Sequence, residues 1–133
     1  MAQGPLLGFI PIWQEDVVCD GAVPANRVVM RSTLESGTNA KRAKLPTSAT
    51  AVFYGISNNR IDAASGDTIP IIIHGRAWGT AAAAITRGQR LITDVNGKLS
   101  PALDAVGEQV IGVAEEDAAT DAIFAVTISN YVR

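Results

Sequence analysis

From Val17 onward the sequence consists of short runs of β-type residues separated by turn residues, and this pattern limits the possible folds more than any other feature. Val, Ile and Thr dominate these runs, and their branching at Cβ favours pleated, half-buried strands over helices. Only residues 80–84 (TAAAA) look helical, and that run is too short to form a stable helix alone. We expect strands near residues 17–19, 27–31, 51–57, 69–74, 89–93, 109–114 and 123–129.

Turn residues fall at regular positions between these runs. Asn96-Gly97 lies between the runs 91–93 and 98–99 and predicts a hairpin, because a type I′ turn needs positive φ at both central residues. Further turns are expected at residues 37–39, 57–59 and 65–67.

The chain also contains a weak internal repeat. Residues 55–57 and 63–69 resemble 112–114 and 118–123, while 27–29 and 44–45 resemble 90–92 and 98–99. Two similar β-meanders would each expose an apolar face if they stood alone. The sequence therefore predicts that they close together into a compact antiparallel β-barrel or sandwich.

The first 16 residues differ from the rest of the 133-residue chain, which has the length of one domain. Their prolines and glycines exclude a helix or a central strand, yet apolar side chains are frequent. We predict an extended N-terminal arm over residues 1–16 and a single β domain over 17–133. The arm packs either on its own core or on a neighbouring subunit, and both possibilities stay open here.

Large apolar side chains are the candidates for contacts with a neighbouring protein or subunit. Tryptophan is favoured at interfaces because it offers wide apolar area and one donor, but it is equally common in small cores. The candidates are Phe9, Ile10, Ile12 and Trp13 in the arm, and Trp78 in the domain.

Composition excludes several classes of partner. The net charge of −2 leaves no basic footprint for nucleic acid, and the one basic cluster, residues 41–44, is typical of a solvated loop or hairpin tip. No signal peptide and no apolar run long enough to span a bilayer are recognisable. We therefore expect neither direct nucleic-acid binding nor a membrane.

The search for chemistry finds no catalytic, cofactor-binding or metal-binding residues. His74 and Cys19 are the single histidine and cysteine, too few for a soft-metal site, and Cys19 is expected to be a small buried hydrophobe. Residues 94–97 resemble the start of a calcium loop but fit a hairpin better. Glu115-Glu116-Asp117 with Asp121 could pair carboxylates, but a solvated acidic turn is favoured. No cofactor and no enzyme activity are expected.

At three places the sequence resembles tailed-phage capsid decoration (cement) proteins. The stretches are IIHGRA at 72–77, AAITRGQRLITDVNGKL at 83–99 and VIGVAEEDAA at 110–119, within a likeness covering about residues 50–130. The resemblance implies a β fold that is a barrel, a sandwich or tulip-like. It also implies a virion protein, made in the host bacterial cytoplasm. Such a protein binds the outer surface of the icosahedral head, often as a homotrimer, and clamps neighbouring major capsid proteins.

Other functions remain alternatives. The first is another structural β module of the virion, such as a head fibre base, a tail protein or a receptor- or carbohydrate-binding protein; copy number per particle separates these from cement. A β-barrel hydrolase using Glu115 and Asp121 would need a nucleophile–base pair, and none can be named.

Overall fold

The structure, a computed structural model, describes residues 13–32, 42–47, 53–59, 61–103 and 106–132. Within these residues it consists of strands and connections without a helix, which confirms the expected mainly β fold. The strands are β1 (Trp13–Cys19), β2 (Val28–Arg31), β3 (Arg42–Lys44), β4 (Phe53–Ser57), β5 (Thr68–Thr80), β6 (Arg90–Thr93), β7 (Leu99–Pro101), β8 (Gln109–Ala114) and β9 (Ile123–Val132).

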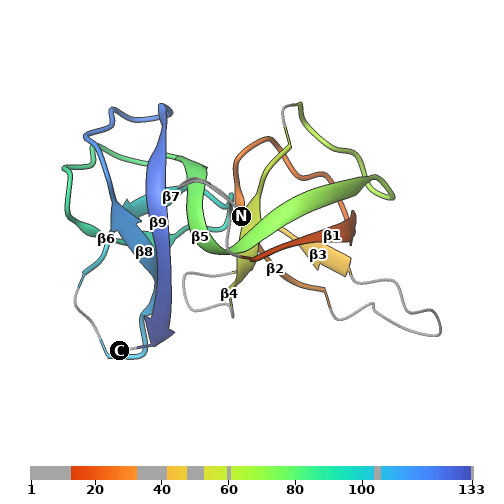
Figure 1. The fold of residues 1–133 in the computed structure, drawn as a ribbon, viewed down its shortest axis with the longest axis horizontal. Coiled ribbons are helices and arrows are strands. Elements are labelled where there is room, and N and C mark those ends of the chain that lie inside the picture. Colours follow the sequence, from red (N-terminus) through yellow and green to blue (C-terminus); the bar gives the residue numbers. More distant parts are fainter. Residues whose placement is uncertain (1–12, 33–41, 48–52, 60, 104–105, 133) are drawn as a thin grey trace, which may run out of the picture.

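The first half of the chain closes into a five-stranded barrel. Its strands follow the order β1-β3-β2-β4-β5, and β5 returns to pair antiparallel with β1. The closure leaves none of these strands as an open edge, which is how barrels avoid unpaired backbone groups. We call this unit the first barrel; it lies on the right in Figure 1.

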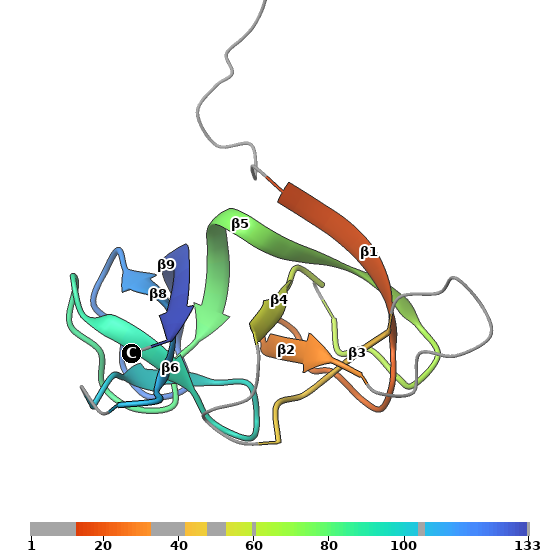
Figure 2. The ribbon, with the colours of Figure 1, turned by 90° about the horizontal axis from the view of Figure 1, so that it is seen from below.

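Strand β5 continues beyond the first barrel and becomes part of a second one. Gly75 has φ of 106°, and β5 changes direction between the two barrels (Figures 1 and 2). From there the order is β5-β9-β8-β6-β7, and a parallel bridge between Ala81 and Leu99 brings β7 back to the end of β5. The two barrels thus share one strand, which serves as the last strand of one and the first of the other.

The two barrels have equivalent pairings, which confirms the internal repeat. The correspondence differs slightly from the sequence match: Val29 is equivalent to Leu91, and Ala43 to Leu99. Four pairs of the first barrel each have an equivalent pair in the second. Cys19–Ala43 corresponds to Ala81–Leu99, Val29–Gly55 to Leu91–Gly112, Val23–Ala63 to Ile85–Ala118, and Ile56–Ile72 to Val113–Thr127.

A shared apolar core joins the barrels. One cluster fills the first barrel and includes Val29 and Ile71. The other fills the second barrel, but it also takes in Val28, Ile56 and Ile72 from the outside of the first. Ile71 and Ile72, which are adjacent in the chain, therefore pack into different apolar clusters. Burial of apolar side chains between the barrels holds their relative positions.

Two expectations about strands need correction, and the helix-like run of residues 80–84 forms no helix. Strand β1 begins at Trp13, four residues earlier than expected, because Trp13–Val18 pair with β5. The basic cluster is not a loop or hairpin tip over residues 42–44; it forms β3, in which Ala43 is fully buried between two basic side chains. Residues 80–84 are not helical: Thr80 ends β5, and the main chain of Ala81 bonds to Ala122 and Asp121.

The predicted hairpin is present, but its turn is different. Strands β6 and β7 pair antiparallel around residues 94–98, and Gly97 has φ of 73°. The φ angle of Asn96 is not positive, so the turn is not type I′. Instead Asp94 closes it, because its Oδ1 accepts hydrogen bonds from the main-chain N–H groups of Asn96 and Lys98, both at 2.9 Å.

Candidate functional site

The interface candidates lie in different parts of the chain. Trp13 opens β1 opposite His74, and Trp78 lies further along β5, beyond the bend at Gly75. Their side chains are 56% and 52% exposed, so neither tryptophan belongs to the core. Phe9, Ile10 and Ile12 fall outside the described residues, and their role as contacts stays a prediction.

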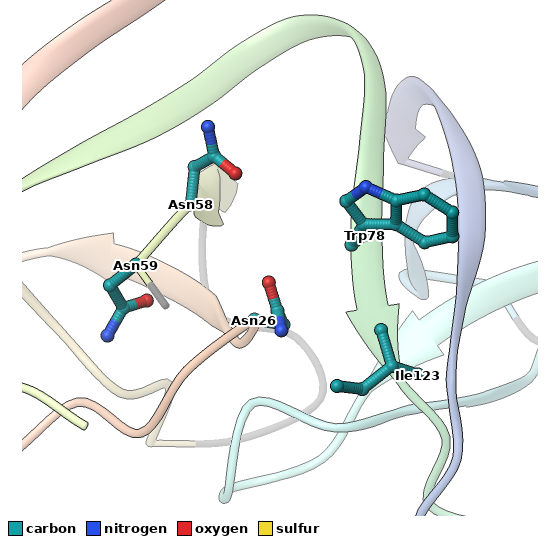
Figure 3. Close-up of a pocket in the computed structure, with 5 residues that line it drawn as sticks. All are labelled: Asn26, Asn58, Asn59, Trp78 and Ile123. Atoms are coloured by element: carbon teal, nitrogen blue, oxygen red, sulfur yellow. The ribbon is translucent and has the colours of Figure 1, made fainter. Parts of the chain in front are cut away.

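A groove with a volume of about 560 Å³ lies between the two barrels. We call it the inter-barrel groove. Figure 3 shows Trp78 and Ile123 on the side of the second barrel and three asparagines on the side of the first, with the side chain of Asn59 pointing away from Trp78. The described lining is uncharged and consists of Asn26, Asn58, Asn59, Trp78 and Ile123.

The turn that carries Asn26 is fixed from both barrels. Asn26 adopts φ of 57°, a left-handed conformation that asparagine tolerates better than most residues. The N–H of Arg27 donates to Ser57 Oγ at 2.9 Å, and Ser57 N–H donates to the carbonyl of Arg27 at 2.8 Å. From the second barrel, Thr80 Oγ1 donates to the carbonyl of Asn26 at 3.0 Å. Hydrogen bonds to the main chain of Asn26 and Arg27 therefore fix this wall of the groove.

The side-chain amide of Asn59 is buried and has one unused acceptor. The side chain is only 9% exposed, and its Nδ2 donates to the carbonyls of Val23 at 3.2 Å and Ile61 at 2.8 Å. Since carbonyls can only accept, these two bonds fix which end of the amide is nitrogen. Asn59 Oδ1 then has no partner. A buried acceptor without a partner is uncommon, and this one has too little accessible surface for a ligand in the groove to reach it.

Trp78 is uncovered because its cross-strand neighbour is small. It pairs with Ala125 on β9, whose methyl group cannot shield an indole. Trp78 and Ala125 also line a second hollow of about 330 Å³ together with Arg76. Arg76 Nε contacts Glu115 Oε2 at 3.1 Å, so its charge already has a partner. The indole thus stands between two hollows on the surface of the second barrel.

The acidic residues around 115–121 serve the turns of the second barrel. Glu115 Oε2 also accepts from Thr127 Oγ1 at 2.5 Å, and Glu116 Oε2 accepts from Ala125 N–H at 2.8 Å. Asp117 accepts from Arg87 N–H at 2.8 Å. Each of these carboxylates therefore accepts a hydrogen bond from a donor within the protein, rather than being only solvated.

Asp121 belongs to the same region and pairs with Lys98 at 2.8 Å. The hydrogen bond and charge of Lys98, followed by the charge of Arg27, lower the pKa of Asp121 below its ordinary value. Asp121 therefore contributes an ion pair on the surface, separate from the carboxylates of the acidic turn.

Cys19 is fully buried in the first barrel, as expected. Burial, with a smaller contribution from Asp67, raises the pKa of its thiol. His74 is exposed near the bend of β5. In the part of the chain that the structure describes, no three His, Cys, Asp or Glu side chains gather into a possible metal site. That part also contains no helix long and apolar enough to cross a membrane.

Comparisons with known proteins give one matching family and one similar solved structure. The family profile described as phage cement protein matches residues 16–129. The structure is similar to the crystal structure of the head fiber gp8.5 N base of bacteriophage phi29, with a TM-score of 0.68 and 19% sequence identity. That match covers 88% of this chain and 93% of the other, and at this identity it shows a common fold. A search of curated proteins gives no match.

Proposed function

The chain belongs to the family of phage cement proteins, and we propose that it decorates the outer surface of a tailed-phage head by clamping neighbouring major capsid proteins. The observation that carries the proposal is the family match, which spans almost all of the described fold. As a member of this family the chain is a capsid cement protein and a component of the virion. The clamping, the outer position and the major capsid protein as partner are the proposal.

The fold suits such a role because a clamp needs a firm body and surface rather than chemistry. Two barrels that share β5 and a common core cannot separate without breaking the strand pairing and apolar contacts between them. Weak contacts gain strength when subunits are linked, since each later contact becomes intramolecular. We therefore include self-association, as a homotrimer, in the proposal.

We assign the contact with the capsid or with a sister subunit to the N-terminal arm. Its candidate residues Phe9, Ile10 and Ile12 precede Trp13, whose exposed indole begins β1. Because β1 is anchored to β5 from Trp13 onward, a segment of 12 residues is tied to the body at a fixed point. Fully extended it would reach about 40 Å, which is far enough to lie on a neighbour.

A head fibre base is the second candidate. The similarity to the phi29 head fiber base favours it on fold alone. The two candidates differ in number of copies, because a fibre base is needed only where a fibre stands while cement covers the shell.

The proposal is tested by adding purified chain to expanded phage heads that lack it. We expect saturable binding and a gain in survival of the heads under osmotic shock. A chain without residues 1–12 should keep its melting temperature and bind less. Removal of residues 1–15 should lower the melting temperature as well, because it takes three residues from β1.

Two results would contradict the proposal. If the full chain does not bind such heads at all, it is not a decoration protein. If the chain without residues 1–12 unfolds, the segment belongs to its own core and the arm is not the contact.

A further inference from the structure

We propose that the inter-barrel groove binds a neutral saccharide, which adds a ligand to the capsid role and does not depend on it. Trp78, so far an interface candidate, then contacts this ligand. The proposal rests on the two-sided, uncharged lining of the groove.

One wall of the groove is apolar and flat. The indole of Trp78 is 52% exposed, and Ile123 beside it is 57% exposed. An exposed indole offers a broad rigid surface at low cost in conformational entropy. One face of a pyranose ring carries mainly C–H groups and matches such a surface, whereas its hydroxyl groups do not.

The opposite wall presents amides. Asn58 is exposed and Asn26 is half-buried, and Figure 3 shows both side chains across from Trp78. An amide both donates and accepts, as a sugar hydroxyl does, so each asparagine can pair with neighbouring hydroxyl groups.

Charge decides between ligand classes. The described lining contains no charged side chain, so nothing there recognises a phosphate, a sialic acid or an acidic peptide. Arg76 lines the adjacent hollow, and Glu115 pairs with it there. A ligand with one apolar face and many neutral hydroxyl groups fits the groove better than an ion.

The two tryptophans of the chain make the site directly observable. In a Trp13→Phe variant the remaining indole is that of Trp78; in a Trp78→Phe variant it is that of Trp13. Each variant is titrated with the methyl glycosides of glucose, galactose, mannose and N-acetylglucosamine, and with sialyllactose as a charged comparator. The measurement is the NMR signal of the indole Nε1–H and of the asparagine side-chain amides.

We expect at least one neutral glycoside to shift the Trp78 indole and the Asn58 amide saturably, with no shift of the Trp13 indole. Trp78→Ala should weaken binding about tenfold, as loss of an aromatic contact does. Asn58→Ala, at an exposed position that should not disturb folding, should weaken binding less.

The proposal is overturned if no neutral glycoside gives a saturable shift, or if Trp78→Ala binds as well as the parent. It is also overturned if acrylamide fails to quench the Trp78 fluorescence of the free protein, because the groove is then covered by a second copy. None of these results bears on capsid attachment, which is measured separately on phage heads.

Discussion

Gly55 and Gly112 occupy the same position in the two barrels, and each allows a neighbouring strand to approach closely. A Cβ on Gly55 would lie 3.0 Å from the carbonyl oxygen of Ile72, and one on Gly112 would overlap the carbonyl oxygen of Thr127. Ile72 and Thr127 are themselves equivalent residues of β5 and β9. The repeated fold thus requires the same small residue twice, for the same steric reason.

Alanine at these two glycines should destabilise the protein unequally. Gly112→Ala places a methyl group against main-chain atoms that cannot rotate away, and we expect a loss of about 3 kcal/mol in the free energy of unfolding. Gly55→Ala meets Ile71 Cδ1, the movable end of a side chain, and Ile72 O, both at 3.0 Å. It should cost about 1 kcal/mol. Denaturant unfolding of both variants measures the difference.

Gly66→Ala is the control for this comparison. Nothing lies within 4 Å of its added Cβ, but its φ is 92°, so only backbone strain of about 1 kcal/mol is expected. Equal stability of Gly112→Ala and the parent would show that β8 and β9 are not packed as described.

The hydrogen bond from Thr80 to the carbonyl of Asn26 should contribute to the union of the barrels. Thr80→Val keeps the shape and removes the donor, so we expect a loss of about 1 kcal/mol in unfolding free energy. Thr80→Ser retains the hydroxyl and should recover most of that loss. If Thr80→Val is as stable as the parent protein while Thr80→Ser is less stable, the hydrogen bond from Thr80 to Asn26 has no stabilising role.

Asp121 should titrate below the ordinary pH range of an aspartate because Lys98 lies beside it. A pKa lowered by folding stabilises the protein above the pKa of the unfolded state, and the contribution disappears as pH falls through the folded pKa. An NMR titration of the Asp121 carboxyl group measures the midpoint. Lys98→Met should raise that midpoint, and high salt should raise it in the parent. An unchanged midpoint in Lys98→Met would contradict the pairing.

The thiol of Cys19 should be unreactive in the native protein. It is fully buried, and its pKa is raised, so little thiolate exists at neutral pH. We expect labelling by a thiol reagent to proceed only as fast as the first barrel opens. Labelling in guanidinium chloride provides the reference rate for the open chain. Native labelling at that same rate would place Cys19 on the surface, contrary to the structure.

Much of the fold follows from local sequence patterns. Branched residues and turn residues alternate clearly enough to reveal β2, β4, β6, β8 and β9, and the repeat reveals the two similar units. Strand β3 is hidden because one apolar residue, Ala43, stands between two basic ones. The continuity of β5 is hidden because Gly75 and the following alanines look like strand-breaking and helical signals, although tertiary pairing with β9 overrides them.

The inter-barrel groove could not be predicted in the same way. Its residues come from a turn near Asn26, the end of β4 and the strands β5 and β9, which meet only after both barrels have closed. The sequence does single out Trp78 as a large anchor. Nothing local indicates that Asn59 donates through Nδ2 and leaves Oδ1 unpaired, since both accepting carbonyls belong to other segments of the fold.

The central claim is that this chain is cement on the phage head, and its copy number in the virion tests that most directly. We would purify the particles and quantify the chain against the major capsid protein by mass spectrometry. The account predicts a copy number of the same order as that of the major capsid protein. A few copies per particle would place the chain in a fibre or tail instead, and its absence from the particle would contradict a structural role in the virion.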